Sequence, residues 1–155
     1  RVGVIGAGAI SQVAHLPVLR KLKGVEVAAI CDADFPKARA LADRFQVESA
    51  FDDIEDLLEN SELDAVVICT PNHLHEPHVQ AALSAGLHVL VERPLAPSAA
   101  GVQKILRQAE RQHSATRSRT HLDEPPANPQ RFILNRSGFP ADSVPSANRA
   151  PGKAG

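Results

Sequence analysis

The chain begins with a short apolar run followed by the glycine-rich segment Gly6-Ala7-Gly8-Ala9-Ile10-Ser11. Where such a segment joins a strand to a helix, the first glycine permits a tight turn and the second lets the backbone approach a pyrophosphate closely. The helix N-terminus then offers unpaired N–H groups and its positive dipole end to that anion. The third position of the pattern holds Ser11, which is still small enough to pack between helix and strand. The residues expected to bind the phosphates are Gly6, Gly8, Ala9 and Ile10.

An acidic residue, Asp32, ends the second apolar run. A carboxylate at this place accepts hydrogen bonds from the adenosine ribose and repels a 2'-phosphate, which favours NAD. NADP is the alternative, because Lys37 and Arg39 lie one turn further along the chain. Many loops match the glycine pattern alone, and a lone aspartate could simply form a turn. The order of strand, glycine turn, helix, strand and acid nevertheless favours dinucleotide binding.

Two polar corners follow later apolar runs, at Thr70-Pro71-Asn72 and Glu92-Arg93-Pro94. The first lies across the switch point from the glycine turn in the expected strand order, where ligands bind over the carboxyl ends of strands. Thr70 and Asn72 can hydrogen-bond a ribose or the nicotinamide side of a ligand, while Pro71 stiffens the loop. An ordinary helix-capping turn is the alternative there, and a surface ion pair is the alternative for the second corner.

Several histidines invite a metal interpretation, because His75 and His78 are spaced to share a helix face and His73 is close by. No cysteine or distant ligand pair completes a tetrahedral set, so we expect no metal. His15 and His88 are assigned only structural roles.

Composition narrows the class of protein. The chain has 155 residues, enough for one ordinary domain, and a net charge of -1 with a pI near 6.7. Such a charge gives no basic surface field for nucleic acid or an anionic membrane. Cys31 and Cys69 both end apolar runs and are expected to be reduced, buried thiols of a cytoplasmic protein.

Apolar runs of strand length alternate with amphipathic segments, which predicts an α/β fold. Right-handed crossovers then give a Rossmann-like doubly wound parallel sheet with strand order 3-2-1-4-5. The expected strands are Val2–Ile5, Val25–Cys31, Ser49–Phe51, Ala65–Cys69 and His88–Val91. The expected helices are Ala9–Leu22 with Leu16, Leu19 and Leu22 buried, Phe35–Phe45 capped by Asp34, Asp53–Glu59, Leu74–Ser84, and Ser98–Gln112 capped by Ser98.

The pattern breaks after Gln112. Residues 113–155 are rich in Pro, Ser, Arg and Ala and show little apolar periodicity. Such a segment cannot bury enough surface to offset its ordering entropy, so a disordered C-terminal tail is expected. The predicted organisation is a dinucleotide-binding domain at 1–112 and a tail at 113–155.

Together these features resemble the N-terminal NAD(P)-binding domain of the Gfo/Idh/MocA family, which includes glucose-fructose oxidoreductase and inositol dehydrogenase. The matching segments are Val4–Gly8, Val66–Asn72 with His75, and Ala81–Pro94. The last is the most specific, because it is similar to the family signature of a small-residue helix, a glycine and a strand ending in Glu-Lys-Pro. The resemblance covers only the N-terminal part of a family member.

The resemblance implies a two-domain oxidoreductase that transfers a hydride between NAD(P) and a sugar, polyol or related hydroxy compound. It implies that the nicotinamide lies near Glu92 and Pro94, adds His75 to the cofactor-binding residues, and makes Glu92 and Arg93 the candidate catalytic residues. Arg93 stands where the family usually has lysine. Arginine keeps the positive charge but does not release a proton at neutral pH, so it can position a ligand but not relay protons.

Nothing after Gln112 resembles the family's C-terminal substrate domain. The hypothesis is that residues 113–155 are a frameshifted or wrongly assigned end that replaces this domain and leaves the chain truncated and inactive alone. One alternative is a non-catalytic dinucleotide-binding remnant, accessory domain or redox-sensing module. A methyltransferase is disfavoured, because the two polar corners have no reason to occur in one. Apolar surface left by the missing domain would favour a homo-oligomer.

Overall fold

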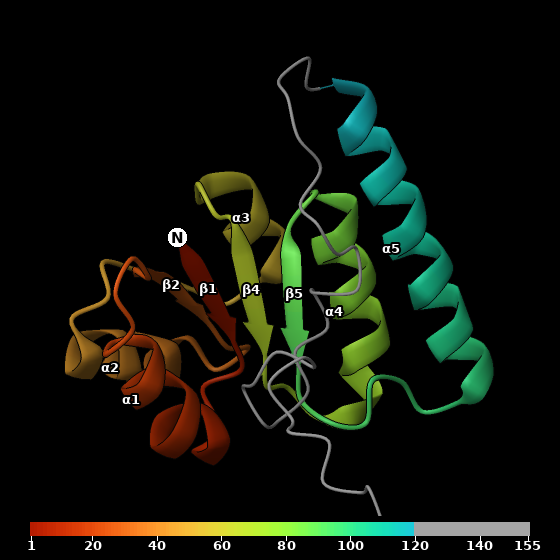
Figure 1. Cartoon of the computed structure of the whole chain (residues 1–155). Coiled ribbons are helices and arrows are strands. Elements are labelled where there is room, and N and C mark those ends of the chain that lie inside the picture. The colour runs from red at the N-terminus through yellow and green to blue at the C-terminus, as the bar shows by residue number, and fades with distance from the viewer. Residues whose placement is uncertain (120–155) are drawn as a thin grey trace, which may run out of the picture.

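The computed structural model describes residues 1–119, with side chains described as far as Gln112. Five strands form one parallel sheet in the order β3-β2-β1-β4-β5, with helices on both faces (Figure 1). This is the predicted doubly wound order, so the fold class is confirmed. The strands are β1 (Val2–Ile5), β2 (Val27–Cys31), β3 (Ser49–Phe51), β4 (Ala65–Ile68) and β5 (His88–Val91).

The helices follow the predicted order, and α2 has its predicted bounds. Asp34 caps α2 by accepting a hydrogen bond from the Lys37 backbone N–H. Helix α5 continues to Arg119 instead of ending at Gln112, and the rest of the predicted tail, residues 120–155, lies outside the described residues. Within residues 1–119, no helix is long and apolar enough to cross a membrane. The helices are η1 (Ser11–His15), α1 (Leu16–Leu19), α2 (Phe35–Phe45), α3 (Ile54–Asn60), α4 (Asn72–Ser84) and α5 (Ala99–Arg119).

The first helix differs most from its prediction. It contains a π-helical segment, η1, before the short α-helical segment α1 ends at Leu19. Leu16 is fully buried as expected, but Leu22 is 49% exposed, so its predicted burial was wrong. The reason is that the chain leaves the helix after Leu19, and Leu22 lies in the turn that leads to Gly24.

The sheet separates two hydrophobic cores. Along β4, Val66 and Ile68 face the core covered by α3, α4 and α5, whereas Val67 faces the core covered by α1 and α2. Neighbouring strand residues point to opposite faces, which explains why strands buried on both sides have almost continuous apolar sequences. The carboxyl ends of the parallel strands meet at one edge, and the glycine turn, Asp32 and both polar corners follow them there.

Gly6 is required where β1 ends. Its φ is +100°, and a Cβ added to it would lie 2.7 Å from the carbonyl carbon of Cys69 and 2.9 Å from the backbone nitrogen of Thr70. Both contacts are with backbone, which cannot move aside as a flexible side chain could. Any side chain at Gly6 would therefore separate the end of β1 from the end of β4.

We expect Gly6→Ala to lower the free energy of unfolding by about 2 kcal/mol or more, because it combines left-handed backbone strain with a steric clash. Gly8→Ala is the matched control, since a Cβ at Gly8 meets no heavy atom within 4 Å and its φ is not in the left-handed region. Urea denaturation of both variants measures the difference. Equal stability of the two variants would contradict the close packing at Gly6.

Candidate dinucleotide site

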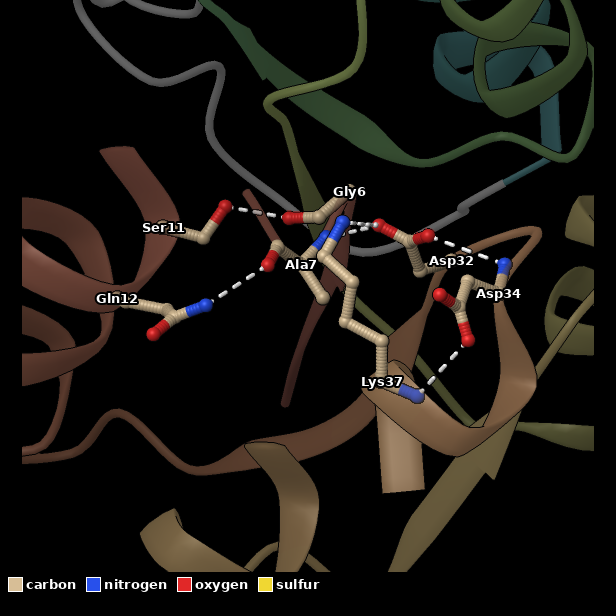
Figure 2. Close-up of polar contacts among 7 residues, drawn as sticks. All are labelled: Gly6, Ala7, Ser11, Gln12, Asp32, Asp34 and Lys37. Atoms are coloured by element: carbon tan, nitrogen blue, oxygen red, sulfur yellow. Dashed lines mark hydrogen bonds and ion pairs between the residues drawn. The ribbon is translucent and has the colours of Figure 1, made fainter. Parts of the chain in front are cut away.

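The glycine turn is fixed to the helix that follows it. The Ser11 hydroxyl donates a hydrogen bond to the Gly6 carbonyl, and Gln12 Nε2 donates to the Ala7 carbonyl at 3.0 Å (Figure 2). Ser11 is fully buried. The sequence predicts for Ser11 only the role of a small residue that packs between helix and strand. Its hydroxyl also satisfies a backbone carbonyl, which glycine or alanine at this position could not do.

Open space lies beside Gly8, where the chain enters the first helix. A Cβ at Gly8 would meet no heavy atom within 4 Å, Ala9 is exposed, and Ile10 is half-buried. The helical conformation begins at Ala9. A pyrophosphate needs this combination of a helix N-terminus and uncovered backbone, so the turn fits a dinucleotide.

Asp32 holds the glycine turn from the opposite side to Ser11 and Gln12 (Figure 2). Its Oδ2 accepts hydrogen bonds from the Ala7 backbone N–H at 2.7 Å and from Lys37 Nζ at 3.0 Å, and its Oδ1 accepts one from the Asp34 N–H at 3.1 Å. Burial acts to raise the pKa of Asp32, but these three donors outweigh it and the pKa is lowered. Asp32 is therefore ionised at neutral pH and helps to set the shape of the turn.

The corner Thr70-Pro71-Asn72 leads from β4 into α4, and its last two residues are exposed. Thr70 Oγ1 lies 3.1 Å from Nδ1 of His78. Burial, together with the charge of His75, lowers the pKa of His78. A neutral His78 ring can accept the hydrogen bond of the Thr70 hydroxyl, so this helix orients the threonine at the edge of the site.

His75 lies beneath both polar corners and is fully buried. Its Nδ1 is 2.6 Å from the Pro94 carbonyl oxygen, and its Nε2 is 2.7 Å from the Thr70 carbonyl oxygen. Carbonyl oxygens only accept, so the ring donates to both of them only when both nitrogens carry hydrogen. The structure thus places this predicted cofactor-binding residue behind the two polar corners, which its ring joins.

The three neighbouring histidines do not converge. His75 contacts two carbonyls, His78 contacts Thr70, and His73 is exposed. Among residues 1–119, no group of three or more His, Cys, Asp and Glu side chains could hold a metal ion.

The corner Glu92-Arg93-Pro94 extends β5, since the Glu92 N–H donates to the Ile68 carbonyl at 2.9 Å. Arg93 and Pro94 are exposed, and the peptide bond between them is cis. Glu92 Oε1 lies 2.7 Å from Nε2 of His15. This contact could not be predicted from the sequence, because no spacing pattern relates two residues 77 positions apart.

The two cysteines are free and buried, as predicted. Burial raises the pKa of Cys31 to about 12 and that of Cys69 to about 11. Neither thiol therefore forms a reactive thiolate at neutral pH.

We expect His75→Ala to lower the free energy of unfolding by about 2 to 4 kcal/mol, because a fully buried ring and its contacts with the Thr70 and Pro94 carbonyls are lost. His73→Ala removes an exposed histidine from the same helix and should change the free energy by less than about 0.5 kcal/mol. Urea denaturation at neutral pH compares them. Equal effects would show that the two carbonyl contacts contribute nothing to stability.

We expect Asp32→Asn to reduce the acid sensitivity of folding. A carboxylate whose folded pKa lies below the ordinary value of 3.8 stabilises the fold above that value and loses this contribution as the pH falls through the folded pKa. The free energy of unfolding should therefore decline less steeply in the variant between neutral pH and strong acid. Urea titrations across this pH range measure it, and parallel curves for the two proteins would contradict the role of Asp32.

Comparison with known proteins identifies the family. The Gfo/Idh/MocA family model, described as an oxidoreductase family with an NAD-binding Rossmann fold, matches residues 1–119. The chain is 35% identical over 111 residues to inositol 2-dehydrogenase from Arthrobacter sp. (strain FB24), which covers 72% of this chain and 33% of that protein. It is 36% identical over 94 residues to D-glucoside 3-dehydrogenase from Escherichia coli K12, which covers 61% of this chain and 27% of that protein.

Solved structures agree with this match. A probable dehydrogenase from Thermotoga maritima superposes with a TM-score of 0.69 at 30% identity, covering 73% of this chain and 34% of that one. An oxidoreductase from Agrobacterium radiobacter in complex with NAD+, L-tartaric acid and magnesium gives a TM-score of 0.68 at 26% identity, covering 72% and 32%. The chain thus spans between 27% and 34% of the length of these relatives. It belongs to the Gfo/Idh/MocA oxidoreductase family, and residues 1–119 correspond to the family's NAD-binding Rossmann domain.

Proposed function

We propose that this chain is the cofactor-binding part of an oxidoreductase that transfers a hydride between NAD and a sugar, polyol or related hydroxy compound. The observation that carries the proposal is the ionised Asp32 beside a glycine turn whose Gly8 is uncovered. The names of the relatives, an inositol dehydrogenase and a glucoside dehydrogenase, support this substrate class. NAD, when bound, supplies the carbon that accepts or donates the hydride.

The adenosine half of the cofactor is assigned to the glycine turn and Asp32. The backbone around Gly8, Ala9 and Ile10 faces the pyrophosphate, and the Asp32 carboxylate faces the ribose hydroxyls. Three donors already contact this carboxylate, and the most mobile of them is the Lys37 ammonium, whose side chain is 42% exposed. A ribose hydroxyl can therefore share the carboxylate with Lys37 or take its place.

The nicotinamide half is assigned to the two polar corners. Thr70, Pro71 and Asn72 line one side, and Glu92, Arg93 and Pro94 line the other, with His75 joining the two from behind. The Arg93 guanidinium attracts polar or anionic groups but does not accept or release a proton. Glu92 is the candidate acid–base group of this corner, although its carboxylate is already hydrogen-bonded to His15.

We further propose that substrate contacts come from a domain that residues 1–119 do not contain, because the matched segment covers only about a third of each relative's length. A homo-oligomer is proposed because apolar surface that a second domain would cover favours association. The second candidate function is a non-catalytic NAD-binding module, which is favoured by Arg93 in place of a proton-relaying lysine. Reduction of added NAD by inositol or a glucoside would exclude the non-catalytic module.

The cofactor proposal is tested by fluorescence titration of the purified chain with NADH and, separately, NADPH. We expect wild type to bind NADH more tightly, and Asp32→Ala to weaken NADH binding about tenfold, since hydrogen bonds to a charged group are lost. The preference for NADH over NADPH should shrink as well, because the variant keeps Lys37 but no longer repels a 2'-phosphate.

The matched control is Glu59→Ala, which removes an exposed carboxylate from α3 and should leave both affinities unchanged. A folded wild-type chain that binds neither dinucleotide would refute the proposal. Equal loss of NADH binding in both variants would show that net charge, not the position of Asp32, determines affinity.

A further inference from the structure

His15 lies in η1, and its Nε2 is 2.7 Å from Oε1 of Glu92. The two side chains are only 18% and 17% exposed, so the contact is partly shielded from water and from salt. An imidazole N–H that donates to a carboxylate forms a charge-assisted hydrogen bond, because the acceptor is ionised.

The pair joins the first helix to the end of β5 on one face of the sheet. Leu16, directly after His15, and Leu90, two residues before Glu92, both pack in the core covered by α1 and α2, whereas Val91 faces the opposite core. Because neighbouring residues of a strand point to opposite faces, Glu92 points to the same face as Leu90. The His15–Glu92 contact thus lies at the edge where the strands end, between the first helix and the corner that follows β5.

The helix that carries His15 is itself fixed to the glycine turn. Ser11 and Gln12, in the same π-helical segment, bond to the carbonyls of Gly6 and Ala7. A π-helical segment contains one more residue per hydrogen-bonded turn than an α-helix and is often found at functional sites. A continuous chain of contacts therefore runs from the phosphate-binding turn through η1 to the corner Glu92-Arg93-Pro94.

We propose that His15 is a positioning residue that sets the distance between the phosphate-binding turn and the nicotinamide-binding corner by holding Glu92. This inference rests on the proposed NAD-binding function. In this role His15 does not contact the ligand. Loss of His15 should therefore lower the affinity for ligands that occupy both halves of the site. It should leave unchanged the affinity for a ligand that occupies only the adenosine half.

The test compares NADH with ADP, which has the adenosine and pyrophosphate but no nicotinamide. We expect His15→Leu to weaken NADH binding about tenfold, as loss of a partly buried hydrogen bond to a carboxylate should, and to leave ADP binding unchanged. His15→Gln, which can offer an N–H to Glu92, should retain most of the NADH affinity. His88→Leu, an exposed histidine at the start of β5, is the control and should change neither affinity.

A second measurement needs no ligand. Urea denaturation of His15→Leu, Glu92→Met and the double variant gives a double-mutant cycle, and a direct contact predicts effects that are not additive. If the two single substitutions change the free energy of unfolding additively, the inference is overturned. So would unchanged NADH binding in His15→Leu, or equal loss of NADH and ADP binding. A folded wild-type chain that binds neither ligand would overturn the proposed function and this inference together, whereas wild-type binding that is insensitive to His15→Leu would overturn the inference alone.

Discussion

The site depends on the close approach of two backbones where β1 and β4 end. At Gly6 the chain turns so near the Cys69–Thr70 peptide that no side chain fits between them. This contact brings the glycine turn and the Thr70 corner to either side of the switch point of the sheet, where parallel strands leave a crevice for a ligand. The other contacts of the site extend outward from this point.

Side chains with two partners join the separate loops of the site. The Asp32 carboxylate connects the glycine turn to the start of α2, and the His75 ring connects the Thr70 corner to Pro94. Each loop is partly exposed, so the protein core does not surround it on all sides. Joined to its neighbours, it keeps a fixed place relative to them, and such preorganisation lowers the entropic cost of binding a long, flexible ligand.

The sequence was sufficient to predict the strand order, the bounds of α2 and the positions of Gly6, Gly8 and Asp32. These features are encoded locally, by residues within one strand–turn–helix unit. The contacts of His15 and His75 could not be predicted in the same way, because each depends on where distant loops meet after folding. The exposure of Leu22 was missed because an unbroken helical period was assumed, whereas the helix ends earlier and has a π-helical segment.

That π-helical segment lets one short helix satisfy two fixed partners. On its N-terminal side Ser11 and Gln12 are anchored to the glycine turn, and on its C-terminal side Leu16 is anchored in the core. Each residue of an α-helix turns the side chain by about 100° around the axis, so one residue more or fewer changes which face is presented. A single-residue deletion between these anchors would hardly change the amino-acid composition of the helix. It would nevertheless rotate the helix out of register with one anchor or the other.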